Sequence, residues 1–153
     1  MIEQALEKRA ARDEFQFRWV AAEGDTTSPT DELPTANKVS ALASLRVLRE
    51  VILSSMDVES AGFSKYQSEQ KTLELILSPR GREKFAQATA NNVGRQLAVI
   101  WRGKVIVAPM IQSQIASGHG SFDCKFGDVE AQEFLDYLNH RPAPHVVGSE
   151  VLK

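Results

Sequence analysis

Apolar and polar residues alternate in three short segments of the chain, at 15–20, 71–77 and 122–126. Side chains on a β-strand point alternately to opposite faces, so this alternation predicts strands with one buried face. In the second segment every other residue from 73 to 77 is leucine. We expect these leucines to face a core and the residues between them to face away from it.

A helix is expected directly after the second of these strands. Ser78-Pro79 is a strong helix start, because the serine hydroxyl accepts a hydrogen bond from a free amide and proline suits the first helical position. Gly81 weakens the first turn, which indicates a close backbone contact there. Gly94 is expected to end the helix. The predicted inner face consists of Phe85, Ala88, Thr89, Asn92 and Val93.

Two strongly apolar runs follow, at 97–101 and 104–108, joined by Arg102-Gly103. A two-residue connection that contains glycine is typical of a β-hairpin. Because both faces of these strands are largely apolar, we expect the hairpin to lie centrally or to be covered on both sides. Pro109 should end the strand pairing, and the apolar stretch 110–115 should form an irregular edge.

The first part of the chain gives weaker signals. Residues 1–12 favour a short helix or a frayed terminus, and residues 23–37 are rich in turn formers and predict a solvated linker. In the apolar run 42–53 the β-branched pair Val51-Ile52 favours a strand, although the start of the run also suits a helix.

Two further helices are expected. Asp57 should cap one or two turns over 58–61, with Gly62 ending them. A last helix should begin at Gly127-Asp128, and prolines in the tail from Arg141 forbid its continuation. Its predicted inner face consists of Ala131, Phe134, Leu135 and Leu138.

Composition and charge narrow the functional classes. A length of 153 residues supports one domain, or a small domain with a tail. The formal net charge of −2 predicts no general attraction to nucleic acid or anionic lipid. Cys124 is the single cysteine, so no internal disulfide forms, which fits a reducing compartment without proving one. We see no signal peptide and no run of the ~20 apolar residues that a membrane helix needs.

No constellation of catalytic residue types stands out. His119, Ser121 and Asp123 would share one strand face, but neighbours along that face are about 7 Å apart, too far for the hydrogen bonds of a triad. Cys124 should be a buried, unreactive thiol between two phenylalanines. Nothing shows the spacing of metal ligands. We therefore expect no enzymatic activity, no cofactor and no metal.

The strand, helix and hairpin of 73–109 contain distinctive short motifs at their turns and helix ends, in particular Ser78-Pro79-x-Gly81 and Asn92-x-Gly94-Arg95. With these motifs, residues 73–138 resemble the head region of the first large periplasmic domain of SecD and SecDF, the membrane proteins that assist bacterial preprotein export. The matching positions are Ser78, Pro79, Gly81, Phe85, Thr89, Asn92, Gly94, Arg95, Ala98, Gly103, Lys104, Val105, Ala108, Pro109, Ile111, Ile115, Gly118 and Phe126.

The chain also departs from the family pattern. Cys124 stands where the family usually has glycine, Val107 replaces a small polar residue, and Arg102 replaces a turn Asp or Asn. The membrane helices that carry the proton-coupled step in the full proteins are absent from this chain, so it alone cannot use a proton gradient.

The resemblance implies an α+β fold, namely a ferredoxin-like sandwich in which a mixed or antiparallel sheet carries two main helices on one face. It implies a non-catalytic domain that binds extended or unfolded polypeptide during export across the bacterial inner membrane. The partners would be preprotein and possible translocon or membrane components, at the periplasmic face. Because no leader is visible, a cytoplasmic location stays open.

We expect polypeptide to bind in an apolar groove or along a sheet edge, with 110–115 as the edge. The expected contacts are Trp101, Met110 and Ile111, and the competing interpretation is that these residues fill the core. The alternative function is a regulatory or sensor module that kept the fold without the export role.

The expected domain organisation has four parts. Residues 1–22 form an N-terminal helix and strand, 23–40 a linker, 41–140 the head-like α+β domain, and 141–153 a flexible tail.

Overall fold

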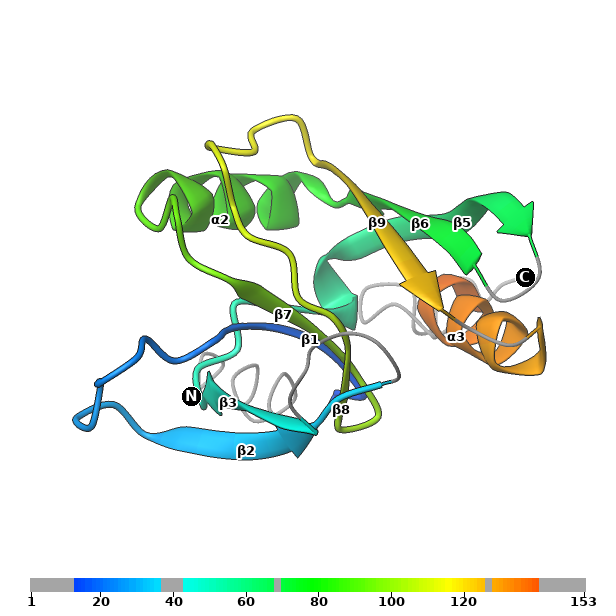
Figure 1. Ribbon diagram of the computed structural model, residues 1–153. Coiled ribbons are helices and arrows are strands. Elements are labelled where there is room, and N and C mark those ends of the chain that lie inside the picture. Colours follow the sequence, from blue (N-terminus) through cyan, green and yellow to red (C-terminus); the bar gives the residue numbers. More distant parts are fainter. Residues whose placement is uncertain (1–12, 37–42, 68–69, 126–127, 141–153) are drawn as a thin grey trace, which may run out of the picture.

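The computed structural model describes residues 13–36, 43–67, 70–125 and 128–140 (Figure 1). The helix expected at 1–12, the tail from 141 and Phe126 lie outside these ranges. The described elements are β1 (Phe15–Trp19), β2 (Thr30–Pro34), β3 (Ser44–Leu48), β4 (Leu53–Ser54), the 3-10 helix η1 (Ser55–Asp57), β5 (Val58–Gln67), β6 (Gln70–Leu77), α2 (Pro79–Ala90), β7 (Leu97–Trp101), β8 (Lys104–Val107), β9 (His119–Lys125) and α3 (Asp128–His140).

The strands form three antiparallel sheets. Sheet A has the order β4-β1-β7-β8, sheet B pairs β2 with β3, and sheet C has the order β5-β6-β9. The α+β class expected from the sequence is therefore confirmed. A ferredoxin-like arrangement is not confirmed, because β6 and β7, which flank α2, belong to different sheets.

Sheet A lies between two hydrophobic clusters. On one face its aromatic and aliphatic residues join the main core, together with residues of sheet C, α2 and α3. On the other face Ala98, Ile100 and Val105 pack with Leu45 and Val47 of sheet B in a minor core. This explains why both phases of β7 are apolar, and it confirms the prediction that the hairpin is covered on both sides.

The hairpin turn follows its sequence closely. Arg102 has φ 53° and Gly103 has φ 77°, so both turn residues adopt the left-handed conformation that fits a two-residue hairpin. Arg102 tolerates this strain with the help of several contacts. Its guanidinium lies 4.6 Å from the Trp101 ring centroid and forms ion pairs with Glu14 and Glu133.

Sheet C is covered on one face. Leu73, Leu75 and Leu77 are buried in the main core, whereas Glu74 and Ile76 between them are exposed. The predicted strand at 71–77 is thus confirmed, with its leucines inward. α3 packs beside this sheet with Ala131, Phe134 and Leu138 buried, and Leu135 is half-buried (Figure 1).

The helix expected after Ser78 is confirmed at its start and ends earlier than expected. The Ser78 hydroxyl accepts a hydrogen bond from the Gly81 amide at 3.0 Å, and Pro79 is the first helical residue. α2 stops at Ala90, and the side-chain amide of Asn92 donates to the Ala88 carbonyl at 2.9 Å. That side chain satisfies a terminal carbonyl in place of a further turn.

The early helix end changes what the following residues do. Gly94 does adopt a left-handed conformation, with φ 91°, but it lies in the turn beyond the helix. Val93, expected on the buried face, is 54% exposed. Phe85 and Thr89 are buried as predicted.

Part of the expected linker is a strand. Residues 30–34 form β2, which pairs with β3, and Leu33 packs against the minor core. The carboxylate of Asp31 forms ion pairs with Arg18 and Arg49, each at 3.0 Å. The stretch is rich in turn-forming residues, and the partner strand and the two arginines that stabilise β2 are distant in sequence. The strand could therefore not be predicted from the residues of this stretch alone.

The expectations for 51–61 were wrong in detail. The strand expected at Val51-Ile52 begins two residues further along the chain, as the short strand β4. The earlier part of the same apolar run forms β3. No helix forms over 58–61, because these residues belong to β5 and pair with β6. Asp57 instead closes the turn that precedes it: its carboxylate accepts from the Ser54 amide in a capping box around η1.

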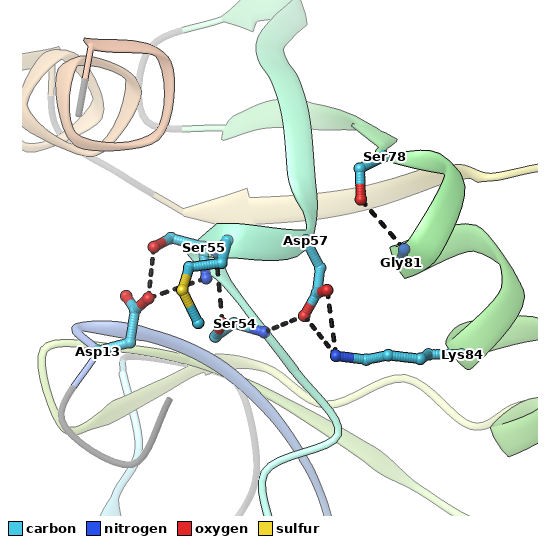
Figure 2. Close-up of polar contacts among 8 residues, drawn as sticks. Asp13, Ser54, Ser55, Asp57, Ser78, Gly81 and Lys84 are labelled. Atoms are coloured by element: carbon cyan, nitrogen blue, oxygen red, sulfur yellow. Dashed lines mark hydrogen bonds and ion pairs between the residues drawn. The ribbon is translucent and has the colours of Figure 1, made fainter. Parts of the chain in front are cut away.

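η1 joins both large sheets to α2 (Figure 2). The Lys84 ammonium of α2 bonds both carboxylate oxygens of Asp57, at 3.0 and 3.1 Å. The Asp57 carbonyl accepts from the Ser78 amide at 2.9 Å. A Cβ added at Gly81 would lie only 2.6 Å from that carbonyl oxygen. The close backbone contact predicted for Gly81 is therefore present, and glycine is required for it.

A second set of bonds ties η1 to β1 and α3. The Asp13 carboxylate accepts hydrogen bonds from the Ser55 hydroxyl and, at 3.1 Å, from the Ser55 amide (Figure 2). Its other oxygen accepts from the Tyr137 hydroxyl at 2.6 Å. Burial and this bond to Asp13 raise the pKa of Tyr137.

Candidate polypeptide-binding surface

The three residues expected to contact polypeptide do not share one surface. Trp101 and Ile111 are each 3% exposed and belong to the main core, where Trp101 packs against Phe134 and Tyr137. Met110 is 58% exposed. Of the three residues, only Met110 is exposed to solvent.

The segment expected to be a sheet edge is an irregular connection held against α2. The Ile111 amide donates to the Arg95 carbonyl and its carbonyl accepts from the Gly94 amide. Further along, the Ile115 amide donates to the Thr89 hydroxyl at 2.9 Å, and the side-chain amide of Gln114 donates to the Ala86 carbonyl of the same helix at 3.1 Å. The Ile111 amide and carbonyl and the Ile115 amide are therefore already paired and cannot pair with an added strand without breaking these bonds.

The outer edge of sheet C is also occupied at its centre. The side-chain amide of Asn139 in α3 donates to the Ala61 carbonyl and accepts from the Ala61 amide, both at 3.0 Å. This pair of bonds imitates a neighbouring strand. An extended chain that added to β5 at this point would have to displace Asn139.

The exposed face of sheet C carries a hollow that the sequence analysis missed. One groove of about 450 Å³ lies over β5, β6 and β9, and another of about 550 Å³ lies between β6, the start of α2 and the connection before β9. Both are lined by Ile76 and His119, so we treat them as one surface and call it the trough. The full lining is Glu59, Ser60, Ala61, Gly62, Glu74, Leu75, Ile76, Leu77, Pro79, Arg82, Glu83, Ala86, Ala116, Ser117, Gly118, His119, Gly120 and Ser121.

Strand register explains the shape of the trough. Residues paired across antiparallel strands point to the same face, so Ile76 stands between Ser60 and His119. One row further, Glu74 stands between Gly62 and Ser121. Gly62 has open space where a Cβ would be. The small side chain of Ser60 and the absent side chain of Gly62 therefore leave a hollow beside Ile76, which is 41% exposed.

The sequence did contain a signal for this surface. In the alternating segment 71–77, Ile76 is the one apolar residue in the phase otherwise taken by Thr72 and Glu74. An apolar side chain out of phase in a half-buried strand points to solvent, and it marks either a contact or a tolerated exposure. The partner strands that complete the trough are distant in sequence, so its shape could not be foreseen.

Two of the residues considered for chemistry, Asp123 and Cys124, lie in β9 and have structural surroundings. Asp123 accepts a hydrogen bond from the Thr72 hydroxyl at 2.8 Å, which places it in a cross-strand pair. Cys124 is 2% exposed, and burial together with the nearby Asp123 charge raises its pKa to about 12. The thiol is thus buried, as predicted. Among the residues that the structure describes, no group of three or more His, Cys, Asp or Glu side chains could hold a metal.

The described residues form a small α+β domain in which one face of sheet C is open and hollowed. The chain belongs to the SecD and SecDF family: the family model described as the SecDF P1 head subdomain matches residues 31–140. The resemblance seen in the sequence is thereby confirmed. Curated relatives that the chain matches carry the name protein translocase subunit SecD.

Two curated relatives illustrate the extent of the similarity. Protein translocase subunit SecD of Acidaminococcus fermentans is 38% identical over 78 residues, which cover 48% of this chain and 19% of the relative. The SecD subunit of Magnetococcus marinus is 30% identical over 108 residues, which cover 69% of this chain and 21% of the relative. The chain thus matches about a fifth of the length of these relatives. No helix in the described part of the chain is long and apolar enough to cross a bilayer.

Solved structures support the fold. A structure described as a membrane component SecDF that enhances protein export aligns with a TM-score of 0.62 at 22% identity, covering 94% of this chain and 69% of that chain. A crystal structure of SecDF in a super-membrane-facing form also gives 0.62, at 21% identity, covering 94% of this chain and 21% of that chain.

Several residues that carry the family resemblance make contacts that stabilise the fold. Gly81 admits the Asp57 carbonyl, and Thr89 holds the connection at Ile115. Arg95 donates to the Val20 carbonyl at 3.1 Å and lies over the Trp19 ring. These roles explain why such residues identify the family without revealing a binding mechanism.

Proposed function

We propose that this chain is a non-catalytic head domain that binds extended or unfolded polypeptide during protein export, at the periplasmic face of the bacterial inner membrane. Family membership supports the export setting, because the curated relatives are translocase subunits. Its partners would be preprotein and components of the translocon or membrane.

The observation that carries the binding role is the trough on the exposed face of sheet C. It joins two grooves, of about 450 and 550 Å³, around a partly exposed isoleucine. An unfolded chain presents isolated aliphatic side chains along an extended backbone. A shallow, elongated surface with one apolar centre suits such a ligand better than a deep pocket would.

Ile76, which was not among the contacts expected from the sequence, is the main apolar contact in the trough. Of the expected contacts, Met110 is a second, separate contact. Trp101 and Ile111 do not contact the ligand in this proposal, because both are almost fully buried in the main core. Any effect of changing them would act through stability.

Binding can be measured by fluorescence anisotropy, with the 153-residue chain titrated into fluorescein-labelled, reduced and alkylated ribonuclease A, which cannot refold. We expect saturable binding that Ile76→Ser weakens about fivefold, because the isoleucine buries apolar surface on binding. Met110→Ser tests the second contact, and Val129→Ser, on an exposed side chain of α3, is the matched control.

The outcomes separate the possibilities. If Met110→Ser weakens binding and Ile76→Ser does not, the polypeptide site moves to Met110. If the wild-type chain does not bind the unfolded protein at all, the polypeptide-binding role is wrong, and the regulatory or sensor role becomes the better account.

A further inference from the structure

The trough carries unbalanced negative charge. Its lining contains the carboxylates of Glu59, Glu74 and Glu83, against one permanent cation, Arg82, and the imidazole of His119. Within the described ranges, no ion pair or hydrogen bond engages the three glutamate side chains. Because the whole chain has a formal charge of only −2, this surface is more acidic than its composition alone requires.

The acids are arranged around the apolar centre. Glu74 lies two residues from Ile76 on the same face of β6, and Glu59 precedes Ser60, which is paired with Ile76. Glu83 lines the other groove from α2. The stem of Arg82 passes close to Gly118, where an added Cβ would lie 2.7 Å from the arginine Cδ. That close passage leaves the cation at one wall of the trough.

We propose that the trough selects extended segments in which an aliphatic side chain is flanked by lysine or arginine. The aliphatic group would cover Ile76, and the flanking cations would approach Glu59 and Glu74. Charge complementarity at such an open surface discriminates between ligands and speeds their encounter more than it raises affinity. This inference rests on the proposed polypeptide-binding function and adds the class of sequence that is bound.

Three fluorescein-labelled peptides of nine residues test the preference. Each has a central leucine in a Gly-Ser background, flanked on both sides by lysine, glutamine or glutamate. Anisotropy titrations of the wild-type chain at low salt should show the lysine peptide binding about fivefold more tightly than the glutamate peptide, since exposed charge pairs contribute modestly. Added sodium chloride should remove most of this difference by screening.

A charge-removing variant locates the preference. In the double variant Glu59→Gln/Glu74→Gln the lysine and glutamate peptides should bind nearly equally. The matched control, Glu23→Gln/Glu130→Gln, changes the net charge by the same amount at exposed positions outside the trough and should keep the preference. Circular dichroism of both variants verifies that each is folded.

The three possible negative results test the charge preference, its location in the trough and the proposed function separately. Equal binding of the three peptides to the wild-type chain would overturn the charge preference and leave polypeptide binding intact. A preference that survives Glu59→Gln/Glu74→Gln would overturn its assignment to the trough. Failure of all three peptides, together with failure of the unfolded protein, would overturn the proposed function itself.

Discussion

Sheets A and C are both antiparallel, and one face of each contributes to the main core. Their second faces, which point away from the main core, differ. The second face of sheet A is covered by sheet B, so Ile100 is 2% exposed. The second face of sheet C has no sheet or helix of the described chain packed over its centre, and Ile76 is 41% exposed. Alternate phases of β7 are therefore both apolar, whereas those of β6 divide into leucines and mainly polar residues.

Under the proposed function, this difference separates residues that act on stability from residues that act on binding. The apolar residues of sheet A pack in the two cores, and the nearby residues that carry the family resemblance stabilise turns and contacts between elements. Sheet C supplies its leucines to the core and keeps a face on which a ligand can lie without any change of fold. The comparison predicts that changes in sheet A act on stability, while changes on the open face of sheet C act on binding.

The largest contrast is expected between two isoleucines. Ile100→Ala should lower the free energy of unfolding by about 2–5 kcal/mol, because it leaves a cavity in the minor core. Ile76→Ala should change it by less than about 0.5 kcal/mol, since the side chain is partly solvated. Urea unfolding followed by circular dichroism measures both. Similar losses for the two variants would show that the face of sheet C is also structural.

A smaller effect is expected at the joint around η1. Gly81→Ala should cost about 1–3 kcal/mol, because the new Cβ meets the Asp57 carbonyl oxygen at 2.6 Å, and this overlap outweighs the better helix propensity of alanine. Gly62→Ala is the matched control, because nothing lies within 4 Å of its added Cβ. The same urea titrations apply. An unchanged unfolding midpoint for Gly81→Ala would contradict the close contact at η1.

The ion pairs of Asp31, which link sheet B to sheet A, should have a weaker, pH-dependent effect. Burial raises the pKa of Asp31, but the hydrogen bonds and charges of Arg18 and Arg49 outweigh burial and lower the pKa below its ordinary value of 3.8. A carboxyl with a lowered folded pKa stabilises above its unfolded pKa, and this stabilisation is lost as the pH falls through the folded pKa.

The stability of the wild-type chain relative to Asp31→Asn should therefore fall as the pH is lowered from about 5 to about 2. Because the Asp31 side chain is 38% exposed, the relative change should be no more than about 1 kcal/mol. Asp25, whose pKa is lowered to about 2 mainly by the Thr27 amide, titrates in both proteins, so its effect cancels in the difference. A pH-independent difference would mean that the arginines do not stabilise the ionised Asp31.

The covered face of sheet C can be checked without altering stability. Cys124 has a pKa raised to about 12 by burial and the Asp123 charge, so its thiol should not react with Ellman's reagent in the native chain at neutral pH. It should react fully in guanidinium chloride. Rapid reaction of the native chain would show that the face against the main core opens.

Local sequence signals predicted the elements whose partners are close along the chain. Ser78-Pro79 started α2, Arg102-Gly103 made the hairpin turn, and the leucines of β6 faced the core. The α+β class and the family followed from these elements. Their success reflects capping and turn chemistry, which depends on a few neighbouring residues.

Elements that depend on distant partners were missed. β2 forms in a turn-rich stretch because β3 and two arginines hold it, and 58–61 is a strand because β6 lies beside it. The trough could not be predicted for the same reason, since β5, β6 and β9 come together only in the folded chain. Trp101 and Ile111, chosen for their apolar character, are core residues.

The central claim is that polypeptide binds on the open face of sheet C. Amide chemical-shift mapping of the isotope-labelled 153-residue chain, titrated with the lysine-flanked peptide, tests it most directly. The account predicts the largest shifts at Gly62, Ile76 and His119, with β7 and β8 unaffected. Shifts confined to the hairpin, or to Met110 and the connection after it, would contradict the account.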